Sequence, residues 1–174
     1  MEQKELLRQW IQQYYDRLTY VAYTYVHDQR RAEDLVQQTF MNAYLSIDQL
    51  KDSTRPYPWL VRIVINQCLN ETRKNSREQP MEFLPEQRSM STEDIYMQQS
   101  RDREVYAAIM SLLEKFRTPI ILYYFEELSV REIADALKLS EGAIKTRLRR
   151  GRDQLKNKLK GVEADELGDA YSSS

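Results

Sequence analysis

The stretch SVREIADALKLSEGAIKTRLRRGRDQLKNK, residues 129–158, contains two helix signals separated by a short turn. Ser129 and Glu132 have the spacing of a capping box, in which each side chain bonds the backbone amide of the other residue, so we expect a helix to begin at Ser129. Ser140 is a capping candidate for a second helix, because it directly precedes a new periodic segment. Two short helices joined by a tight turn predict a helix-turn-helix.

The second of these helices divides its side chains between two faces. Its core-facing positions are Ala143, Ile144, Leu148 and Leu155, and its outward positions are Lys145, Thr146, Arg149, Arg150 and Arg152. Small residues and hydroxyls near the start of the helix permit close approach to a DNA major groove, and the cations that follow suit phosphates and base edges. The alternative is an ordinary solvated basic face, which the preceding helix and turn disfavour.

Composition limits the chain to a small set of classes. The 174 residues are 41% hydrophobic with only four Gly and five Pro, which leaves room for one ordinary domain or two small ones. Helical periodicity dominates and strict alternation is almost absent, so we expect an all-helical protein. The sequence shows neither an apolar run of membrane-spanning length nor a signal peptide, and we therefore expect a cytoplasmic protein.

The sequence offers no apparatus for catalysis. The single Cys68 cannot form an internal disulfide, and the single His27 rules out a site with several histidines. A nucleophile with a base and an orienting group cannot be assembled, and no glycine-rich phosphate loop is present. We therefore expect neither an enzyme nor a bound metal, cofactor or small-molecule substrate.

Charge is unevenly distributed, although the net charge is only -1. Lys and Arg outnumber Asp and Glu by 13 to 8 in residues 103–160, whereas residues 161–174 contain four acidic residues and no basic one. The basic excess thus coincides with the helix-turn-helix, as expected if one face attracts DNA while the whole chain does not coat nucleic acid.

Two amphipathic helices open the chain. The first apolar stripe comprises Leu7, Ile11, Tyr14, Leu18, Val21 and Tyr25 and should end near residues 27–28; the second comprises Ala32, Leu35, Val36, Thr39, Phe40, Ala43, Tyr44 and Ile47, with Asp28 as its cap. The exposed side of the second helix carries Glu33, Asp34, Gln37, Gln38 and Asn42. Its residue types alone favour solvated surface over a docking site.

A third helix should begin at Trp59, after a loop at residues 48–58 that contains two prolines. One face of this helix combines aromatic, amide and guanidinium groups, which are Trp59, Arg62, Asn66, Asn70 and Arg73. Aromatic rings stack on bases and amides bond to base edges, so this face suits single-stranded nucleic acid. The equally weighted alternative is that Trp59 packs on the loop and the amides are merely solvated.

The domain plan follows from these segments. Residues 1–75 form a first helical domain, and residues 76–102 mix Pro, Ser, Gln and acidic residues as a flexible linker does. Residues 103–160 form a second domain, in which one helix ends near Leu113 and another begins at Thr118-Pro119. Residues 161–174 lack an apolar stripe, and we expect this acidic tail to be disordered.

Three segments, in this order, resemble bacterial RNA polymerase sigma factors of the extracytoplasmic-function (ECF, group 4) subfamily of the sigma-70 family. They are AEDLVQQTFMNAY at residues 32–44, PWLVRIVINQCLNETRK at 58–74 and YYFEELSVREIADALKLSEGAIKTRLRRGRDQLK at 123–156. The resemblance covers residues 5–160 and implies region 2, which binds core polymerase and opens the −10 element, joined by a linker to region 4, which binds the −35 element. It further implies an anti-sigma factor, in this group commonly membrane-tethered, as a partner.

The resemblance also implies roles for particular residues. Core polymerase would dock on Asp34, Gln37 and Gln38, which reverses the preference for plain surface. The −10 strand would contact Tyr57, Trp59, Arg62, Asn66, Asn70 and Arg73, with Asn66 at a position that captures a flipped base; the −35 duplex would contact Ser140, Glu141, Gly142, Lys145, Thr146, Arg147, Arg149 and Arg150.

Two positions depart from the family pattern. Gln38 stands where the family commonly has Glu, and Glu114 stands where a Leu-Pro pair is usual.

Two other hypotheses remain, a stand-alone DNA-binding regulator with a sensing or dimerising N-terminal domain, and an adaptor whose basic helix is a non-specific tether. The mixed face of the third helix favours the sigma factor over both.

Overall fold

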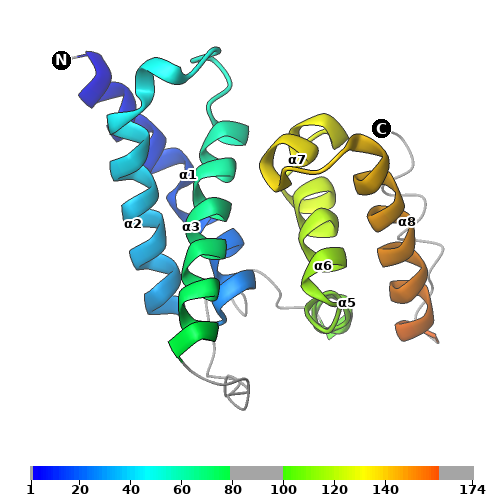
Figure 1. The fold of residues 1–174 in the computed structure, drawn as a ribbon. Helices are drawn as coiled ribbons and strands as arrows, with labels where there is room; N and C mark the ends of the chain where they lie inside the picture. The colour runs from blue at the N-terminus through cyan, green and yellow to red at the C-terminus, as the bar shows by residue number, and fades with distance from the viewer. Residues whose placement is uncertain (1, 79–99, 161–174) are drawn as a thin grey trace. The chain divides into compact units, whose positions relative to one another are not determined.

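The computed structural model describes residues 2–78 and 100–160, and in these ranges every regular element is helical (Figure 1). Contacts cluster the chain into two compact units, built chiefly from residues 2–78 and 100–160. The predicted all-helical fold with two small domains is therefore confirmed. Helices extend three residues into each end of the predicted linker, to Glu78 and from Ser100, while the rest of that linker and the acidic tail lie outside the described residues.

The first unit contains α1 (Glu2–Val26), α2 (Gln29–Leu45), a short 3₁₀ turn η1 (Ile47–Gln49) and α3 (Tyr57–Glu78). Each of the three α-helices packs against the other two. Their shared core contains the fully buried side chains Leu18, Val21, Ala22, Val36, Ala43, Leu60, Val64, Ile65 and Cys68. The unit is therefore a three-helix bundle, and its core is entirely apolar at these positions.

The turn between α1 and α2 is set by two residues. His27 adopts a left-handed conformation with φ of 54°, and its N–H donates to the Tyr23 carbonyl at 2.8 Å, which ends α1. The Asp28 carboxylate then accepts from the Arg31 N–H at 3.0 Å and caps α2, as predicted. The two helices are thus separated by only two residues and form the expected hairpin.

The predicted stripe of α1 is wrong in its N-terminal half. Ile11 is 37% exposed, whereas Trp10 is buried and meets Trp59 edge-on with ring centroids 6.2 Å apart. A stripe advancing by alternating threes and fours follows a period of 3.5, and it drifts around a straight helix of period 3.6. Over a helix of 25 residues this drift moves one end of the stripe off the core.

The third helix begins at Tyr57, two residues before the predicted start. Pro58 therefore lies in the first turn of α3, where a missing N–H costs nothing because that group has no intrahelical partner. An ion pair then holds α3 to α2. The Arg31 guanidinium donates from Nε and Nη2 to the same Glu71 carboxylate oxygen, at 3.0 and 2.8 Å.

The second unit contains α5 (Ser100–Met110), α6 (Glu114–Ile120), a π-helical segment η2 (Ile121–Phe125), α7 (Val130–Leu137) and α8 (Glu141–Lys158). The buried Arg117 side chain donates from Nη1 to the Met110 and Leu112 carbonyls, at 3.3 and 3.2 Å. It therefore bonds backbone acceptors where α5 ends and ties this end to α6.

The predicted helix start at Thr118-Pro119 is wrong, because α6 begins at Glu114 and contains Pro119. The Leu113 carbonyl accepts from the amides of Phe116 and Arg117, each at 2.9 Å, and so opens the helix earlier. Pro119 removes a donor only for the carbonyl of the exposed Lys115, where water can replace it. The unusual Glu114 occupies the first turn, where a carboxylate is favourable.

The helix-turn-helix is confirmed with both predicted caps. The Ser129 N–H donates to a Glu132 carboxylate oxygen at 3.0 Å and the Glu132 N–H donates to Ser129 Oγ at 3.1 Å, completing the capping box of α7. Lys138 ends α7 in a left-handed conformation with φ of 56°. Ser140 Oγ then accepts from the Ala143 N–H at 3.1 Å and caps α8.

Candidate nucleic-acid and protein interfaces

Helix α8 presents a basic face because its opposite face is fixed against α6. Ile144, Leu148 and Leu155 are buried, as predicted, and Gly151 is buried with them. A Cβ on Gly151 would lie only 3.0 Å from Ile120 Cγ1, so glycine allows α8 to approach α6 closely. This contact determines which side chains of α8 point outward.

The residues predicted to contact duplex DNA lie on and beside this outward face. Ser140, Glu141, Gly142, Lys145, Arg149 and Arg150 are exposed, whereas Thr146 and Arg147 are half-buried. Their DNA contacts stay a prediction. The arrangement offers guanidinium and ammonium groups along α8 and exposed polar residues at its start. These donors suit a major groove.

One basic residue of α8 has a partner within the unit. Arg152 Nη1 donates to the Tyr124 hydroxyl oxygen at 3.0 Å, which links α8 to the π-helical segment η2. Arg152 is exposed, as the sequence predicted. The sequence did not predict its contact with Tyr124, because a π-helical turn shifts side chains off the α-helical period. This bond restrains the Arg152 guanidinium at the C-terminal end of the basic face.

The mixed face predicted for α3 is present. Arg62, Asn70 and Arg73 are exposed and Trp59 and Asn66 are half-buried, while the opposite side of α3 enters the core. Trp59 meets Trp10 of α1 edge-on, so its indole packs against a helix of the bundle, a partner that the alternative of packing on the loop did not predict. Trp59 is nevertheless partly exposed, which leaves part of the residue accessible to a base.

The prediction that Tyr57 contacts the −10 strand is corrected, because the residue is only 6% exposed. It packs against Tyr14, with ring centroids 5.0 Å apart, and the Arg17 guanidinium lies over it at 4.0 Å from the ring centroid. As the first residue of α3 it points toward α1, so it offers no stacking platform in this conformation. Sequence analysis missed Arg17, whose exposed side chain adds a cation beside the start of α3.

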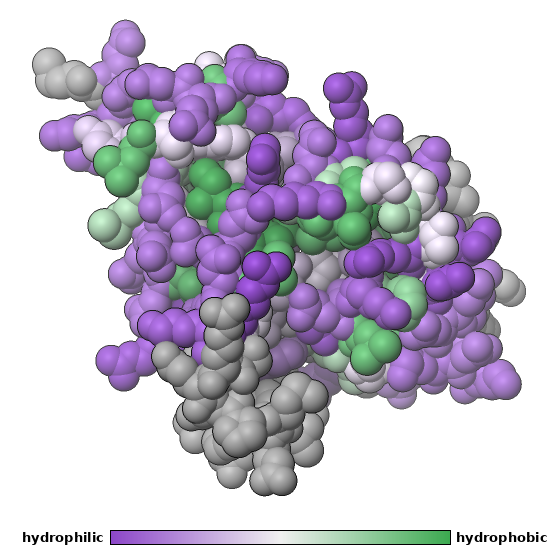
Figure 2. Space-filling view, in the orientation of Figure 1, coloured by the Kyte–Doolittle hydropathy of each residue, from purple (hydrophilic) through white to green (hydrophobic). Residues whose placement is uncertain are grey.

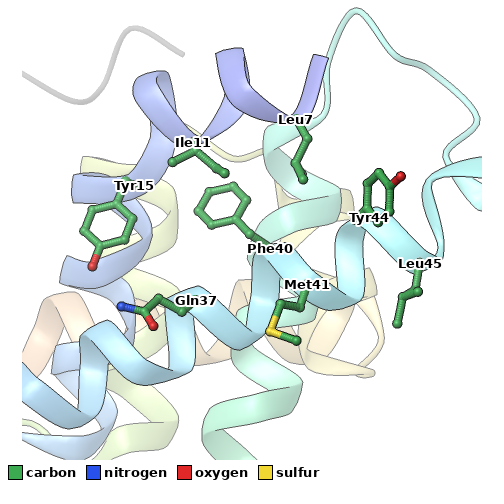
Figure 3. A pocket seen from close by; sticks show the side chains of 8 residues that line it. All are labelled: Leu7, Ile11, Tyr15, Gln37, Phe40, Met41, Tyr44 and Leu45. Carbon is green, nitrogen blue, oxygen red and sulfur yellow. The ribbon is translucent and has the colours of Figure 1, made fainter. Parts of the chain in front are cut away.

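Asp34, Gln37 and Gln38 are exposed on α2, as predicted. Beside them lies a feature that the sequence analysis missed, a pocket of about 400 Å³ between α1 and α2, here named the α1–α2 pocket. Figure 3 shows its lining residues, which are Leu7, Ile11, Tyr15, Gln37, Phe40, Met41, Tyr44 and Leu45. Gln37 belongs to both features, so the polar strip and the pocket form one continuous surface.

The α1–α2 pocket is apolar and open. Leu7 and Ile11 point from α1 toward Phe40, whereas Met41 and Leu45 project from α2 (Figure 3). Met41 is 67% and Leu45 81% exposed, and more generally Figure 2 shows apolar side chains as separate patches on a largely hydrophilic surface. Met41 and Leu45 follow Gln37 at helical spacing, and this spacing was the missed signal.

Acidic groups lie near Tyr15, one of the residues that line this pocket. Partial burial raises the pKa of the Tyr15 hydroxyl above its usual value, and the nearby Glu33 carboxylate raises it further, while a hydrogen bond with Gln37 opposes the shift. Asp16 and Asp34 act in the same direction as Glu33. A partner that covers the pocket therefore meets apolar side chains and, beside Tyr15, a group of carboxylates.

Two kinds of feature are absent from residues 2–78 and 100–160. Among them, no cluster of His, Cys, Asp and Glu is arranged to hold a metal ion. The helices in the same ranges include none that is both long and apolar enough to cross a membrane.

Comparison with known proteins gives the class first. The model of sigma-70 region 2 matches residues 10–78, and the model of sigma-70 region 4 matches residues 102–155. These ranges contain the three-helix bundle and the helix-turn-helix, respectively, so the two units of this chain are those of a sigma-70 family protein.

Curated relatives narrow the class. The chain is 28% identical to ECF RNA polymerase sigma factor SigW of Bacillus subtilis over 86% of both chains, and 32% identical to SigM of the same species over 74% of this chain and 80% of the relative. It is 34% identical to the ECF sigma factor SigE of Mycolicibacterium smegmatis over 86% of this chain, but spans 60% of that longer relative. The chain belongs to the ECF RNA polymerase sigma factors.

Solved structures agree with this assignment. The sigma factor RpoE of Bartonella quintana, in complex with the anti-sigma factor NepR, is similar with a TM-score of 0.68 and 25% identity, over 90% of this chain and 97% of that one. CnrH, in complex with the cytosolic domain of CnrY, shares the fold with a TM-score of 0.61. The chain is therefore an alternative sigma factor that acts in transcription initiation.

Proposed function

We propose that the two units divide promoter recognition between them on core RNA polymerase. The surface of α2 binds the polymerase, the exposed face of α3 holds the separated −10 strand, and α8 contacts the −35 duplex. The observation that carries the proposal is the outward basic face of α8, displayed by a helix-turn-helix with both caps formed. This face and the mixed face of α3 offer chemistry for duplex and single-stranded DNA in one chain.

Docking on the polymerase uses polar and apolar contacts together. Asp34, Gln37 and Gln38 supply exposed polar groups, and the adjoining pocket supplies Met41 and Leu45. Apolar side chains left in water contribute affinity when a partner covers them, while the carboxylates near Tyr15 favour a partner with basic groups. Gln38 in place of the family's Glu removes one charge from this surface and so weakens that selection.

Opening of the −10 element follows from preferential binding of the separated strand. The partly exposed Trp59 side chain can stack on a base, Asn66 can bond a base edge, and Arg62 can meet a phosphate. Each stacked base contributes about 1 to 3 kcal/mol, which offsets the cost of unpairing. This step needs no covalent chemistry, and we propose that the protein is not an enzyme.

A reversible inhibitor is the second partner that we propose. The similar sigma factor RpoE was solved in complex with the anti-sigma factor NepR, and the open α1–α2 pocket is a surface that such a protein can cover. Because we assign the same surface to polymerase, inhibitor and polymerase should compete. The protein would then work in the cytoplasm, where its DNA and polymerase are, and be released when the inhibitor dissociates.

In vitro transcription tests the proposal directly. Core polymerase is incubated with fragmented genomic DNA with and without this protein, and new RNA 5′ ends are mapped. We expect discrete start sites that share −10 and −35 motifs. Sequence-specific duplex binding by the protein alone, without new starts, would instead identify a stand-alone regulator, and full competition by random DNA would identify an adaptor.

A further inference from the structure

The two glycines of α8 differ in what surrounds them. A Cβ on Gly151 would lie 3.0 Å from Ile120 Cγ1 and 3.5 Å from the Phe116 carbonyl oxygen, so close packing on α6 favours glycine there. A Cβ on Gly142 would meet only Ser140 Oγ, at 4.0 Å, which is an ordinary contact distance. Packing inside the protein therefore explains Gly151 and leaves Gly142 unexplained.

Backbone conformation does not explain Gly142 either. The residue lies in the first turn of a regular α-helix that begins at Glu141, and its φ is not in the left-handed region. Alanine adopts this conformation more readily, since glycine loses more backbone entropy on entering a helix. The free protein would thus be more stable with alanine at this position.

The position of Gly142 points to a requirement outside the protein. Gly142, Thr146 and Arg149 recur at spacings of four and three residues, so they share one face of α8. Gly142 and Arg149 are both exposed. DNA that contacts Thr146 and Arg149 therefore passes over the first turn of the helix, where a recognition helix comes nearest to base edges.

We propose that Gly142 determines −35 specificity by its lack of a side chain, which allows base edges on the floor of the major groove to contact the backbone of α8. This inference rests on the proposed function of α8. A methyl group at position 142 would hold the helix away from the groove floor and weaken the base contacts of its neighbours. Contacts to phosphates at the groove margins would persist, because flexible cationic side chains reach them from a greater distance.

The test uses holoenzyme assembled from core polymerase and the full chain carrying Gly142→Ala. The probes are a promoter duplex from the start-site mapping and the same duplex with its −35 element scrambled. We expect binding to the intact promoter to weaken by about tenfold and binding to the scrambled duplex to change by less than about twofold. The melting temperature of the free variant should rise by about 2 to 4 °C.

Two further variants separate steric exclusion from a change in helix stability. Asn157→Ala, in the exposed last turn of α8, also improves helix propensity and should leave promoter affinity unchanged. Gly142→Val adds more bulk and should weaken promoter binding more than Gly142→Ala. A loss for Asn157→Ala equal to that for Gly142→Ala would overturn the inference.

Arg149→Ala, measured on the same probes, distinguishes failure of this inference from failure of the proposed function. Wild-type affinity for Gly142→Ala together with weakened binding for Arg149→Ala would refute the role of Gly142 and retain α8 as the −35 helix. Wild-type affinity for both variants would refute the assignment of α8. Equal losses for Gly142→Ala on intact and scrambled duplexes would refute contact with base edges.

Discussion

Removing the two most exposed apolar side chains of the α1–α2 pocket should weaken polymerase binding without unfolding the protein. Full burial of a Leu or Met side chain contributes about 1.5 to 3 kcal/mol. Since Met41 is 67% and Leu45 81% exposed, a partner that covers them gains most of this amount, about 1 to 2 kcal/mol for each. Alanine keeps the Cβ, so the double variant should lose about 2 kcal/mol, roughly 30-fold in Kd.

Fluorescence anisotropy with labelled protein and core polymerase measures this loss. Leu113→Ala is the matched control, because Leu113 is a similarly exposed leucine, at 65%, and lies outside the pocket. Thermal unfolding of the free variants should differ little from wild type, since truncating exposed side chains removes few internal contacts. A normal melting temperature with weaker binding would locate the effect at the interface.

The reasoning fails if Met41→Ala combined with Leu45→Ala binds core polymerase with wild-type affinity while Asp34→Ala weakens it. That result would mean that the polar strip docks alone and the pocket stays solvated in the holoenzyme. An equal loss for Leu113→Ala would refute the specific role of the pocket, because any exposed leucine would then matter as much.

Three other predictions concern particular residues. Gly151→Ala should destabilise the second unit by up to about 2 kcal/mol in urea unfolding, since displacing Ile120 costs about 1 to 3 kcal/mol and the gain in helix propensity returns about 1 kcal/mol; unchanged or higher stability would show that Ile120 moves aside at little cost. Lys138→Gly should stabilise the same unit by about 1 kcal/mol by relieving a left-handed φ of 56°, and an unchanged urea midpoint would contradict this. Asn66→Ala should slow open-complex formation, followed by permanganate footprinting, more than polymerase binding; equal losses would indicate misfolding.

Local rules of helix initiation predicted much of the fold. The caps at Asp28, Ser129 and Ser140 form as expected, because a capping bond involves only residues three positions apart and depends little on distant packing. The start at Thr118-Pro119 failed for the complementary reason. Proline suits a first turn but does not require one, and a carbonyl at Leu113 began the helix earlier.

Orientation within a bundle was harder to predict than helix position. The stripe of α1 predicted Ile11 in the core, but contact with both α2 and α3 buries Trp10 instead. Tyr57 was expected on a DNA-binding face, yet its place at the start of α3 points it toward Tyr14. Each error depends on the position of a neighbouring helix. The periodicity of one segment carries no information about that position.

The candidate sites show the same limit in another form. An apolar residue that belongs to the protein's own core and one that awaits a partner have the same composition and the same helical spacing. Phe40 and Met41 are adjacent in sequence, but Phe40 is buried between α1 and α2 while Met41 is mostly exposed. The predicted stripe of α2 includes Phe40 and omits Met41, but only the placement of α1 shows that Met41 borders a pocket. A binding surface of this kind is therefore found by removing the observed core residues from the full set of apolar residues. Gly142 is identified by the same elimination, since it is the glycine of α8 that the internal packing does not explain.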